Sequence, residues 1–427
     1  MYDWANSSYS LVITSALFPI YFHAITTTPE NNTVRFLGRN FNSDSLQTYA
    51  ISIAFLVIAA INPLLSSIAD YSGNKKKFMY FFSTLGAAAC SSLFFFTSLD
   101  TLWIGVFGVV LAAIGYAGSI VFYNAFLPEI AESEDQDKVS AKGFAMGYIG
   151  SSLLLIFSLT MILFPDWYGG ISSGMATRIA FLLVGIWWFG FAQYTFHYLP
   201  NNVYNRKPEG KFVRNGYREL KKVWNELKHT SRLKTFLLSF FFYNMGVQTV
   251  MYVATLFGDG ELHLSSSILI AIILIIQFVA IGGAYLFSTL SRRFGNITSL
   301  CISLFIWVLI CIGAYFCDKK YGVDEQTMFI ILAAVVGLVM GGVQSLSRST
   351  YSKILPETID HASYFSFFDV CDKLGTVLGT FAFGFINEQT GSMRNSIIVL
   401  ASFFIIGLFL LLRMRKNPSD ALKGSQV

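Results

Sequence analysis

The sequence predicts an all-α integral membrane protein with twelve transmembrane helices. Hydrophobic residues make up 54% of the 427 residues and charged residues only 13%, about half the charged share of soluble domains. Apolar runs of about twenty residues recur along the whole chain, and a bilayer core about 30 Å thick needs roughly 20 helical residues to cross it. These two observations exclude an ordinary soluble protein.

The expected spans fall into two groups of six. The first group covers residues 3–24, 46–69, 78–97, 101–126, 143–164 and 178–199, and the second covers residues 234–257, 265–290, 297–316, 327–351, 362–386 and 395–412. Most connections between spans are short, so consecutive spans are expected to run antiparallel. We therefore predict an N-terminal six-helix half at 1–199, a polar linker at 200–233, and a C-terminal six-helix half with a short tail at 234–427.

The distribution of lysine and arginine predicts which side the termini face. Six basic residues fall in the expected outer loops: Arg35, Arg39, Arg178, Lys319, Lys320 and Arg394. Arg348 and Lys373 lie within spans, which leaves 22 of the 30 basic residues for the inner loops and tail. Because basic residues concentrate on the cytoplasmic side, we predict that both termini are cytoplasmic and that a bacterial protein of this kind lies in the plasma membrane.

The linker contains a basic amphipathic pattern. In the stretch KFVRNGYRELKKVWNELKHTSRLK, apolar residues recur at helical intervals: Val213, Tyr217, Leu220, Trp224 and Leu227. Such a helix suits the surface of an inner leaflet that carries anionic lipids. A calmodulin-like or nucleic-acid target has similar basic amphipathy, but we favour the lipid surface and expect no nucleic-acid partner.

Two pairs of short motifs indicate an internal repeat. The motif LPE occurs in FYNAFLPEI after span four and in TYSKILPETI after span ten, 228 residues apart. Gly73-Asn74 after span two and Gly295-Asn296 after span eight are 222 residues apart. Both pairs lie in equivalent inner loops, which predicts two parallel six-helix pseudo-repeats.

At these residues the chain resembles the major facilitator superfamily over its full length. That fold joins two six-helix halves by a long inner loop and handles its substrate between them. The loop after span two is similar to the superfamily's signature G-x-x-x-D-x-x-G-R-K: Asp70 and Gly73 match, while Ser66 and Asn74 replace the first glycine and the arginine. The resemblance implies that Asp70 meets the start of span eleven and helps to hold an inner gate.

Three longer stretches resemble one branch of the superfamily. MYDWANSSYSLVITSALFPIYF, GGVQSLSRSTYSKILPE and YFSFFDVCDKLGTVLG look like the autophagy-related vacuolar amino-acid effluxers and their little-characterised bacterial relatives. The resemblance implies amino-acid efflux. Members of this branch carry a short cytoplasmic tail before the DWAN stretch, so we expect Met1 to be an internal methionine of a longer natural chain.

Charged residues within the spans are the first candidates for function, because a charge inside a membrane is expensive. Span eleven carries Asp369, Asp372 and Lys373, and the pair Asp369 and Lys373 has the favourable spacing of four residues. Span ten carries Arg348, which antiparallel packing is expected to bring near this cluster. We interpret the cluster as a proton-coupling site or a gate, with a static ion-pair network as the alternative. Arg348 is also the leading candidate for binding an anionic group.

Polar residues inside spans one, four, seven and ten predict a substrate path. The stretch DWANSSYS places Asp3, Asn6 and Tyr9 three residues apart in span one. A polar stripe that faces a water-accessible cavity costs little, whereas lipid would penalise it. The expected path residues are Asn6, Tyr9, Tyr123, Asn124, Tyr243, Asn244, Gln248, Gln344 and Arg348. Asp3 and Asp70 join the charged cluster as residues expected to couple or gate transport. The alternative is that these groups merely bond between packed helices.

No cofactor, metal site or enzyme activity is expected. The five cysteines contain no CxxC pair, so they do not suggest a metal site. The acidic loop PEIAESEDQDK contains Asp135 and Asp137, a pattern that would suit a membrane-embedded transferase, but no second acidic motif or base accompanies it. We interpret this loop as a solvated run of charges.

The sequence therefore predicts a secondary transporter that moves a small polar solute by alternating access. Amino-acid efflux is the first expectation, a proton is one option for the coupling ion, and the protein is expected to act as a monomer. Export of a drug-like amphiphile, a sugar or a lipid is the alternative. A non-transporting receptor or scaffold is a third class.

Overall fold

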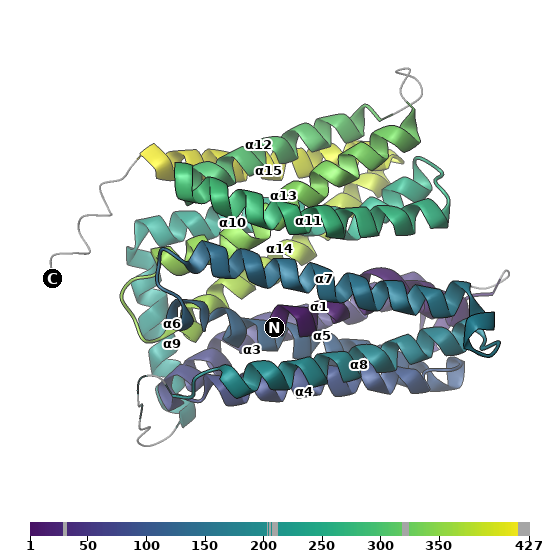
Figure 1. The fold of residues 1–427 in the computed structure, drawn as a ribbon, viewed down its shortest axis with the longest axis horizontal. Coiled ribbons are helices and arrows are strands. Elements are labelled where there is room, and N and C mark those ends of the chain that lie inside the picture. The colour runs from purple at the N-terminus through teal and green to yellow at the C-terminus, as the bar shows by residue number, and fades with distance from the viewer. Residues whose placement is uncertain (29–31, 203, 205, 207–211, 318–323, 417–427) are drawn as a thin grey trace. The chain divides into compact units, whose positions relative to one another are not determined.

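The chain forms two compact units in the computed structural model (Figure 1). The structure describes residues 1–28, 32–202, 204, 206, 212–317 and 324–416. The first unit contains Met1–Asn62, Gly73–Tyr123 and Met146–Arg206, and the second contains Pro63–Ser72, Asn124–Ala145 and Lys207–Val427. Lys319 and Lys320, residues 207–211 of the expected linker and the tail after Lys416 lie outside the described residues. The division into halves at 1–199 and 234–427 stays a prediction.

The first unit is built from long helices. Its first span is continuous and consists of α1 (Tyr2–Ser8), the π-helical segment η1 (Tyr9–Leu17) and α2 (Phe18–Thr26). The other long helices are α3 (Ser43–Ser72), α4 (Lys75–Ser92), α5 (Leu102–Asn124), α7 (Gln136–Leu163) and α8 (Ser173–Tyr198). Two of them are divided between the units: α3 belongs to the first unit up to Asn62, and α7 belongs to it from Met146 onward. Short 3₁₀ turns lie between them at η2 (Leu93–Phe95), η3 (Leu99–Thr101) and η4 (Pro165–Tyr168).

A small hairpin after the first span was not predicted by the sequence. Strand β1 (Thr33–Phe36) pairs antiparallel with β2 (Arg39–Asn42). The two residues of the turn, Leu37 and Gly38, have φ angles of 47° and 80°. A type I′ hairpin turn has positive φ at both central positions, a conformation that glycine adopts readily and leucine does not. The leucine therefore concealed the turn.

The second unit is also built from long helices. They are α10 (Ser231–Gly260), α11 (Ser266–Phe294), α12 (Asn296–Tyr315), α13 (Glu325–Ile354), α14 (His361–Thr390) and α15 (Met393–Lys416). This unit also includes the last turns of α3, the short helix α6 (Leu127–Ile130), the first turns of α7, and α9 (Phe212–His229). In Figure 1, α9 lies at the end of this unit where α14 begins.

The helices are those of a multi-pass integral membrane protein. Among the described residues, eleven helical runs are long and apolar enough to cross a bilayer by length and composition. Helix α14 has 30 residues but is more polar, since it carries Asp369, Asp372 and Lys373. The predicted all-α membrane fold is confirmed, and the count of twelve spans stays a prediction.

Helices α11 and α13 pack with their backbones in direct contact. A Cβ atom added at Gly283 would lie 2.0 Å from the carbonyl oxygen of Leu338, and one at Gly341 would lie 2.1 Å from that of Ala280. Such distances are too short for any side chain, so this interface requires glycine. Close approach through small residues is a main source of helix association in membranes, where the hydrophobic effect between helices is absent.

We predict that Gly283→Ala destabilises the protein and that its neighbour tests the reason. The added methyl group would collide with the backbone of α13, and overpacking of this kind costs about 1–3 kcal/mol. At Gly282 an added Cβ meets nothing within 4 Å, so Gly282→Ala is expected to keep or raise stability through helix propensity. Thermal unfolding of the two purified variants measures the difference. Equal melting temperatures would contradict the packing argument.

Candidate functional site

A charged cluster lies in the first half of α14 and faces α10. The Lys373 Nζ atom is 2.6 Å from a carboxylate oxygen of Asp372 and 3.7 Å from one of Asp369. Asn244 and Gln248 of α10 donate hydrogen bonds to the other oxygen of Asp372, at 2.8 and 3.0 Å. Two groups that the sequence nominated separately, on spans seven and eleven, therefore form one polar site.

The cluster differs from a closed ion-pair network in its exposure. Asp369 and Lys373 are buried, whereas the side chain of Asp372 keeps 18% of its surface accessible. Buried charges are tolerated when each has a partner, and Asp372 has an ammonium and two amides. The carboxylate is thus held in one orientation while part of the side chain stays accessible.

Tyr252 is a member of this site that the sequence did not nominate. It lies one turn beyond Gln248 on α10, close enough to interact electrostatically with Lys373 and Asp372. The spacing Asn244, Gln248, Tyr252 places all three on one helical face. This four-residue spacing is a signal in the sequence from which Tyr252 could have been predicted.

Two further path candidates lie on α10 and α13. Tyr243 is fully buried, and its hydroxyl is 2.7 Å from the hydroxyl of Ser347 on α13. Gln344, also on α13, is partly exposed. Their roles on a substrate path stay predictions.

Arg348 of α13 binds the segment where α5 ends and α7 begins. Its guanidinium donates to the hydroxyl and the carbonyl oxygen of Ser140, both at 2.9 Å, and to the side-chain oxygen of Asn124 at 3.4 Å. The guanidinium carbon also lies 4.3 Å above the ring of Phe144, a cation–π distance. The structure thus joins Arg348 to Asn124, both of which the sequence selected. The expected approach of Arg348 to the α14 cluster stays a prediction.

Asp70, at the end of α3, caps the N-terminus of α14. Its carboxylate accepts hydrogen bonds from the backbone of Ala362 at 3.2 Å and of Ser363 at 2.7 Å, and from the Ser363 hydroxyl at 2.8 Å. A buried carboxylate is stabilised there by the unpaired N–H groups and the positive end of the helix dipole. Asp70 therefore lies where the resemblance placed it, and its part in a gate stays a prediction.

A second buried acid joins three elements of the same unit. Asp137, in the first turn of α7, accepts from Ser291 at 2.8 Å, from Asn296 at 2.7 Å and from Lys353 at 2.7 Å. Arg292 lies 3.7 Å from Asp135 beside it. The interpretation of this loop as solvated charge is wrong for Asp137, which is only 2% exposed. We call the Asp70 and Asp137 contacts the inner clasps.

The internal repeat could have predicted the second clasp. Gly73 and Gly295 are 222 residues apart, and the same offset carries Asp70 to Arg292. The end of α3, with Asp70, contacts the start of α14, and the end of α11, with Arg292, contacts the start of α7. Equivalent helix ends therefore make equivalent contacts, with an acid at one position and a base at the other.

The polar residues of the first span pack inside the first unit. The hydroxyl of Tyr123 donates to the carboxylate of Asp3 at 2.5 Å. Asn6 is 2% exposed, and the ring of Tyr9 lies 5.1 Å from that of Tyr116. Tyr9 also begins the π-helical segment η1, a conformation often found at functional sites. The expected place of Asn6 and Tyr9 on a substrate path stays a prediction.

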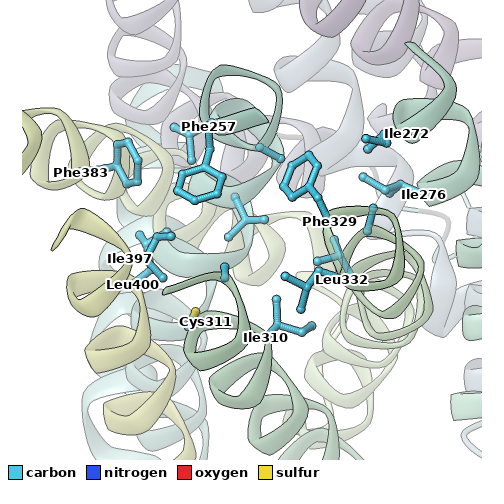
Figure 2. Close-up of a pocket in the computed structure, with 16 residues that line it drawn as sticks. Phe257, Ile272, Ile276, Ile310, Cys311, Phe329, Leu332, Phe383, Ile397 and Leu400 are labelled. Atoms are coloured by element: carbon cyan, nitrogen blue, oxygen red, sulfur yellow. The ribbon is translucent and has the colours of Figure 1, made fainter. Parts of the chain in front are cut away.

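A cavity of about 70 Å³ lies within the second unit (Figure 2). Figure 2 shows its walls: aliphatic and aromatic side chains such as Phe257, Ile272, Phe329 and Phe383, with the Cys311 thiol among them. A buried water needs two to four polar partners, which these side chains do not supply. None of the site residues selected from the sequence lines this cavity, so it suits an apolar group rather than a polar solute.

Comparison with known sequences identifies relatives over nearly the whole chain. The family described as "Vacuole effluxer Atg22 like" matches residues 1–421. YxiO of Bacillus subtilis (strain 168), described as an uncharacterized MFS-type transporter, is 32% identical over 428 residues, which cover 100% of this chain and 96% of that protein. Autophagy-related protein 22-2 of Aspergillus oryzae is 26% identical over 455 residues, covering 87% of this chain and 75% of that protein.

Comparison with solved structures identifies the fold. The major facilitator proton:xylose symporter XylE, bound to 6-bromo-6-deoxy-D-glucose, is similar with a TM-score of 0.73 at 13% identity, covering 96% of this chain and 93% of that one. A bacterial homologue of the iron transporter ferroportin in an outward-facing state gives 0.65 at 11% identity, covering 97% and 98%. Together with the sequence relatives, these likenesses show that the chain has the major facilitator fold and belongs to the vacuole effluxer Atg22-like family of transporters.

Proposed function

We propose that the protein exports an amino acid by alternating access. The observation that carries this proposal is the partly accessible side chain of Asp372, held by Lys373 and by the amides of Asn244 and Gln248. An amino acid carries an ammonium and a carboxylate, so it can replace the ion pair: its ammonium binds Asp372 and its carboxylate binds Lys373. Membership of the Atg22-like family supports efflux as the direction.

Arg348 is proposed as a second contact for the substrate carboxylate. Among the partners of its guanidinium are Ser140 and Asn124, which are neutral. Guanidinium grips a carboxylate with two parallel hydrogen bonds, so an anionic group is a stronger partner than a hydroxyl or an amide. If the substrate carboxylate replaces Ser140 as the partner of Arg348, the contact between α13 and α7 is released. Substrate binding would thereby be linked to movement of α13 against α7.

A proton is the proposed coupling ion. When Asp369 and Asp372 are both ionised and Lys373 is charged, the cluster has a net charge of −1, so one proton neutralises it. Neutralisation lowers the cost of moving the cluster through a low-dielectric environment. Asp3, bound by Tyr123 in the first unit, is proposed as a second acid that carries a proton.

The inner clasps are proposed as the inner gate. Each clasp fastens a segment of the first half to a helix of the C-terminal half: Asp70 to α14, and Asp137 to Lys353 of α13. A solute that leaves the cytoplasm can enter only if these contacts open. We place both termini and the clasps on the cytoplasmic side, in the plasma membrane of a bacterium, with the transporter acting as a monomer.

Export of a drug-like amphiphile is the second candidate. It is favoured by the cavity of Figure 2, whose apolar walls would take a hydrocarbon group. An amphiphile would use the Asp372 site for a cationic head.

The primary test is uptake of a mixed set of labelled amino acids into proteoliposomes, with and without an imposed pH gradient. We expect saturable uptake that the gradient enhances and that Arg348→Ala reduces to background. Uptake of a cationic amphiphile but of no amino acid would favour the second candidate. Absence of uptake of any solute by correctly folded protein would refute the transport proposal.

Substitutions in the α14 cluster should separate binding from coupling. Asp372→Asn keeps the shape of the side chain but removes the negative charge that is proposed to bind the ammonium of the substrate. A hydrogen bond to a charged group contributes about 1.5–3 kcal/mol. We expect a roughly 10- to 100-fold lower kcat/KM for uptake. Asp369→Asn is expected to retain uptake but to lose its response to the pH gradient. Glu388→Gln, an exposed acid on the same helix, is the matched control and should behave as wild type.

Removal of one clasp should open the inner end. Asp70→Ala deletes the cap of α14, a change that costs about 0.5–2 kcal/mol. We expect faster labelling of Cys371, the one partly exposed cysteine among the described residues, by a thiol reagent applied from the cytoplasmic side. Asp324→Ala is the control, because Asp324 caps the start of α13 by accepting from Thr327 at 3.1 Å. Equal acceleration in both variants would mean general loosening and would count against a gate.

A further inference from the structure

Helix α9 contacts both helices that the Asp70 clasp joins. A Cβ atom at Gly216 would lie 2.5 Å from the side chain of Ile68 on α3, and Asn215 donates to the hydroxyl of Tyr71 at 2.8 Å. These two α3 residues flank Asp70. Glycine at 216 therefore allows α9 to lie directly on the end of α3.

The C-terminal half of α9 binds the start of α14. The hydroxyl of Tyr364 donates to Glu226 at 2.6 Å, and the ring of Trp224 lies 5.5 Å from that of Phe367. Lys222 Nζ lies 3.5 Å from the carboxylate of Asp360, the N-cap residue of α14. Together with its contacts on α3, these make α9 a strap across the Asp70 clasp.

Lys222 keeps its charge in this position. Burial lowers the pKa of its ammonium, but the carboxylates of Asp360, Glu219 and Glu226 together raise that pKa above its ordinary value. Lys222 therefore stays charged, and its ammonium lies 3.5 Å from the carboxylate of Asp360. This ion pair is exposed to solvent on the lysine side, so it is a weak and reversible contact.

The remaining surface of α9 is basic and aromatic. With 3.6 residues per turn, Arg214, Arg218, Lys221 and Lys228 fall in one stripe about 80° wide, opposite the docking residues Gly216, Val223 and Leu227. All four basic residues of this stripe are exposed. Tyr217 and Trp224, 64% and 44% exposed, lie between the basic stripe and the docking face. We call the four residues the basic stripe.

A basic stripe with aromatic side chains along its edge is complementary to the surface of an anionic membrane. Aromatic rings prefer the region of the lipid headgroups, and lysine or arginine near a negatively charged leaflet contributes about 1 kcal/mol each. Arginine also binds a phosphate with two hydrogen bonds. An acidic protein surface offers the complementary charge but does not account for Tyr217, which is 64% exposed next to the basic stripe.

We propose that the basic stripe of α9 binds anionic phospholipid headgroups of the inner leaflet, and that this binding holds the strap on the Asp70 clasp and so slows opening of the inner end. The regulatory part rests on the proposed role of the clasp as a gate. The binding part does not, because it concerns α9 alone. Anionic lipid would thus set the rate at which the transporter becomes accessible from the cytoplasm.

The binding test uses the full chain in uncharged detergent. Short-chain phosphatidylglycerol, short-chain phosphatidylcholine and inorganic phosphate are titrated while the melting temperature is followed. Each basic residue contributes about fivefold to affinity, so replacing the four residues of the basic stripe by glutamine should weaken the response to phosphatidylglycerol roughly several-hundred-fold. The control replaces four other exposed basic residues, Lys138, Lys142, Arg293 and Arg413, and should keep the wild-type response.

Four results would overturn the binding proposal. Equal shifts with phosphatidylcholine would show that charge is not recognised, and equal shifts with inorganic phosphate would indicate a free-anion site. Loss of the response in the control variant as well would indicate general electrostatics. A stronger shift with a soluble acidic peptide than with phosphatidylglycerol would assign the stripe to a protein partner instead.

The regulatory test follows labelling of Cys371 in proteoliposomes. We expect phosphatidylglycerol to slow labelling of wild type at least about twofold, and to leave the four-glutamine variant unchanged. If Asp70→Ala accelerates labelling but phosphatidylglycerol has no effect on wild type, the gate stands and the lipid control is refuted. If phosphatidylglycerol raises the melting temperature while Asp70→Ala leaves labelling unchanged, the gate is refuted and the lipid site stands.

Discussion

A charge inside a membrane-embedded bundle needs a partner, and this constraint organises the polar residues of the second unit. Lys373 neutralises Asp372 while two amides of α10 complete its hydrogen bonds. Asp70 is stabilised by the free N–H groups at the start of α14. Asp137 has a lysine, an amide and a hydroxyl. Because a lost partner would leave a buried charge, each of these contacts fixes the position of a helix end or a helix face.

The two inner clasps each stabilise a buried carboxylate, but the element that supplies the acid differs between them. In one, the last turn of α3 supplies the acid to the start of α14. In the other, the start of α7 carries its own acid and the last turns of α11 supply a hydroxyl and an arginine. In both, a carboxylate lies at the positive end of a helix dipole, where it is favoured. The pseudo-repeat therefore preserves the electrostatic result rather than the residue identities, which explains why the second clasp is hard to recognise by motif.

The contacts of α9 are weaker than those of the clasps, and this difference suits a strap. Its ion pair with Asp360 is exposed on the lysine side, and exposed pairs contribute about 0–1 kcal/mol each. Its docking face is narrow, with Gly216, Val223 and Leu227 buried. A helix held by several weak contacts on one face can be stabilised or released by a small binding free energy on its other face. The buried carboxylates of the clasps cannot be released in this way.

The sequence by itself determined the membrane-embedded all-α class, the approximate span limits and most members of the polar site. These follow from local rules: apolar runs of bilayer length, and the high cost of charge within them, which selected Asp369, Asp372, Lys373 and Arg348. The sequence did not predict the hairpin after the first span, because Leu37 adopts a positive φ angle that its side chain disfavours.

The tertiary structure alone decided which polar groups meet. It joined Asn244 and Gln248 to Asp372, gave Arg348 the partners Ser140 and Asn124, and buried Asp137 in a clasp. Pairing of this kind depends on the rotation of each helix about its axis and on its shift along a neighbour. Glycine contacts such as those between α11 and α13 set these quantities, and no local pattern in the chain encodes them.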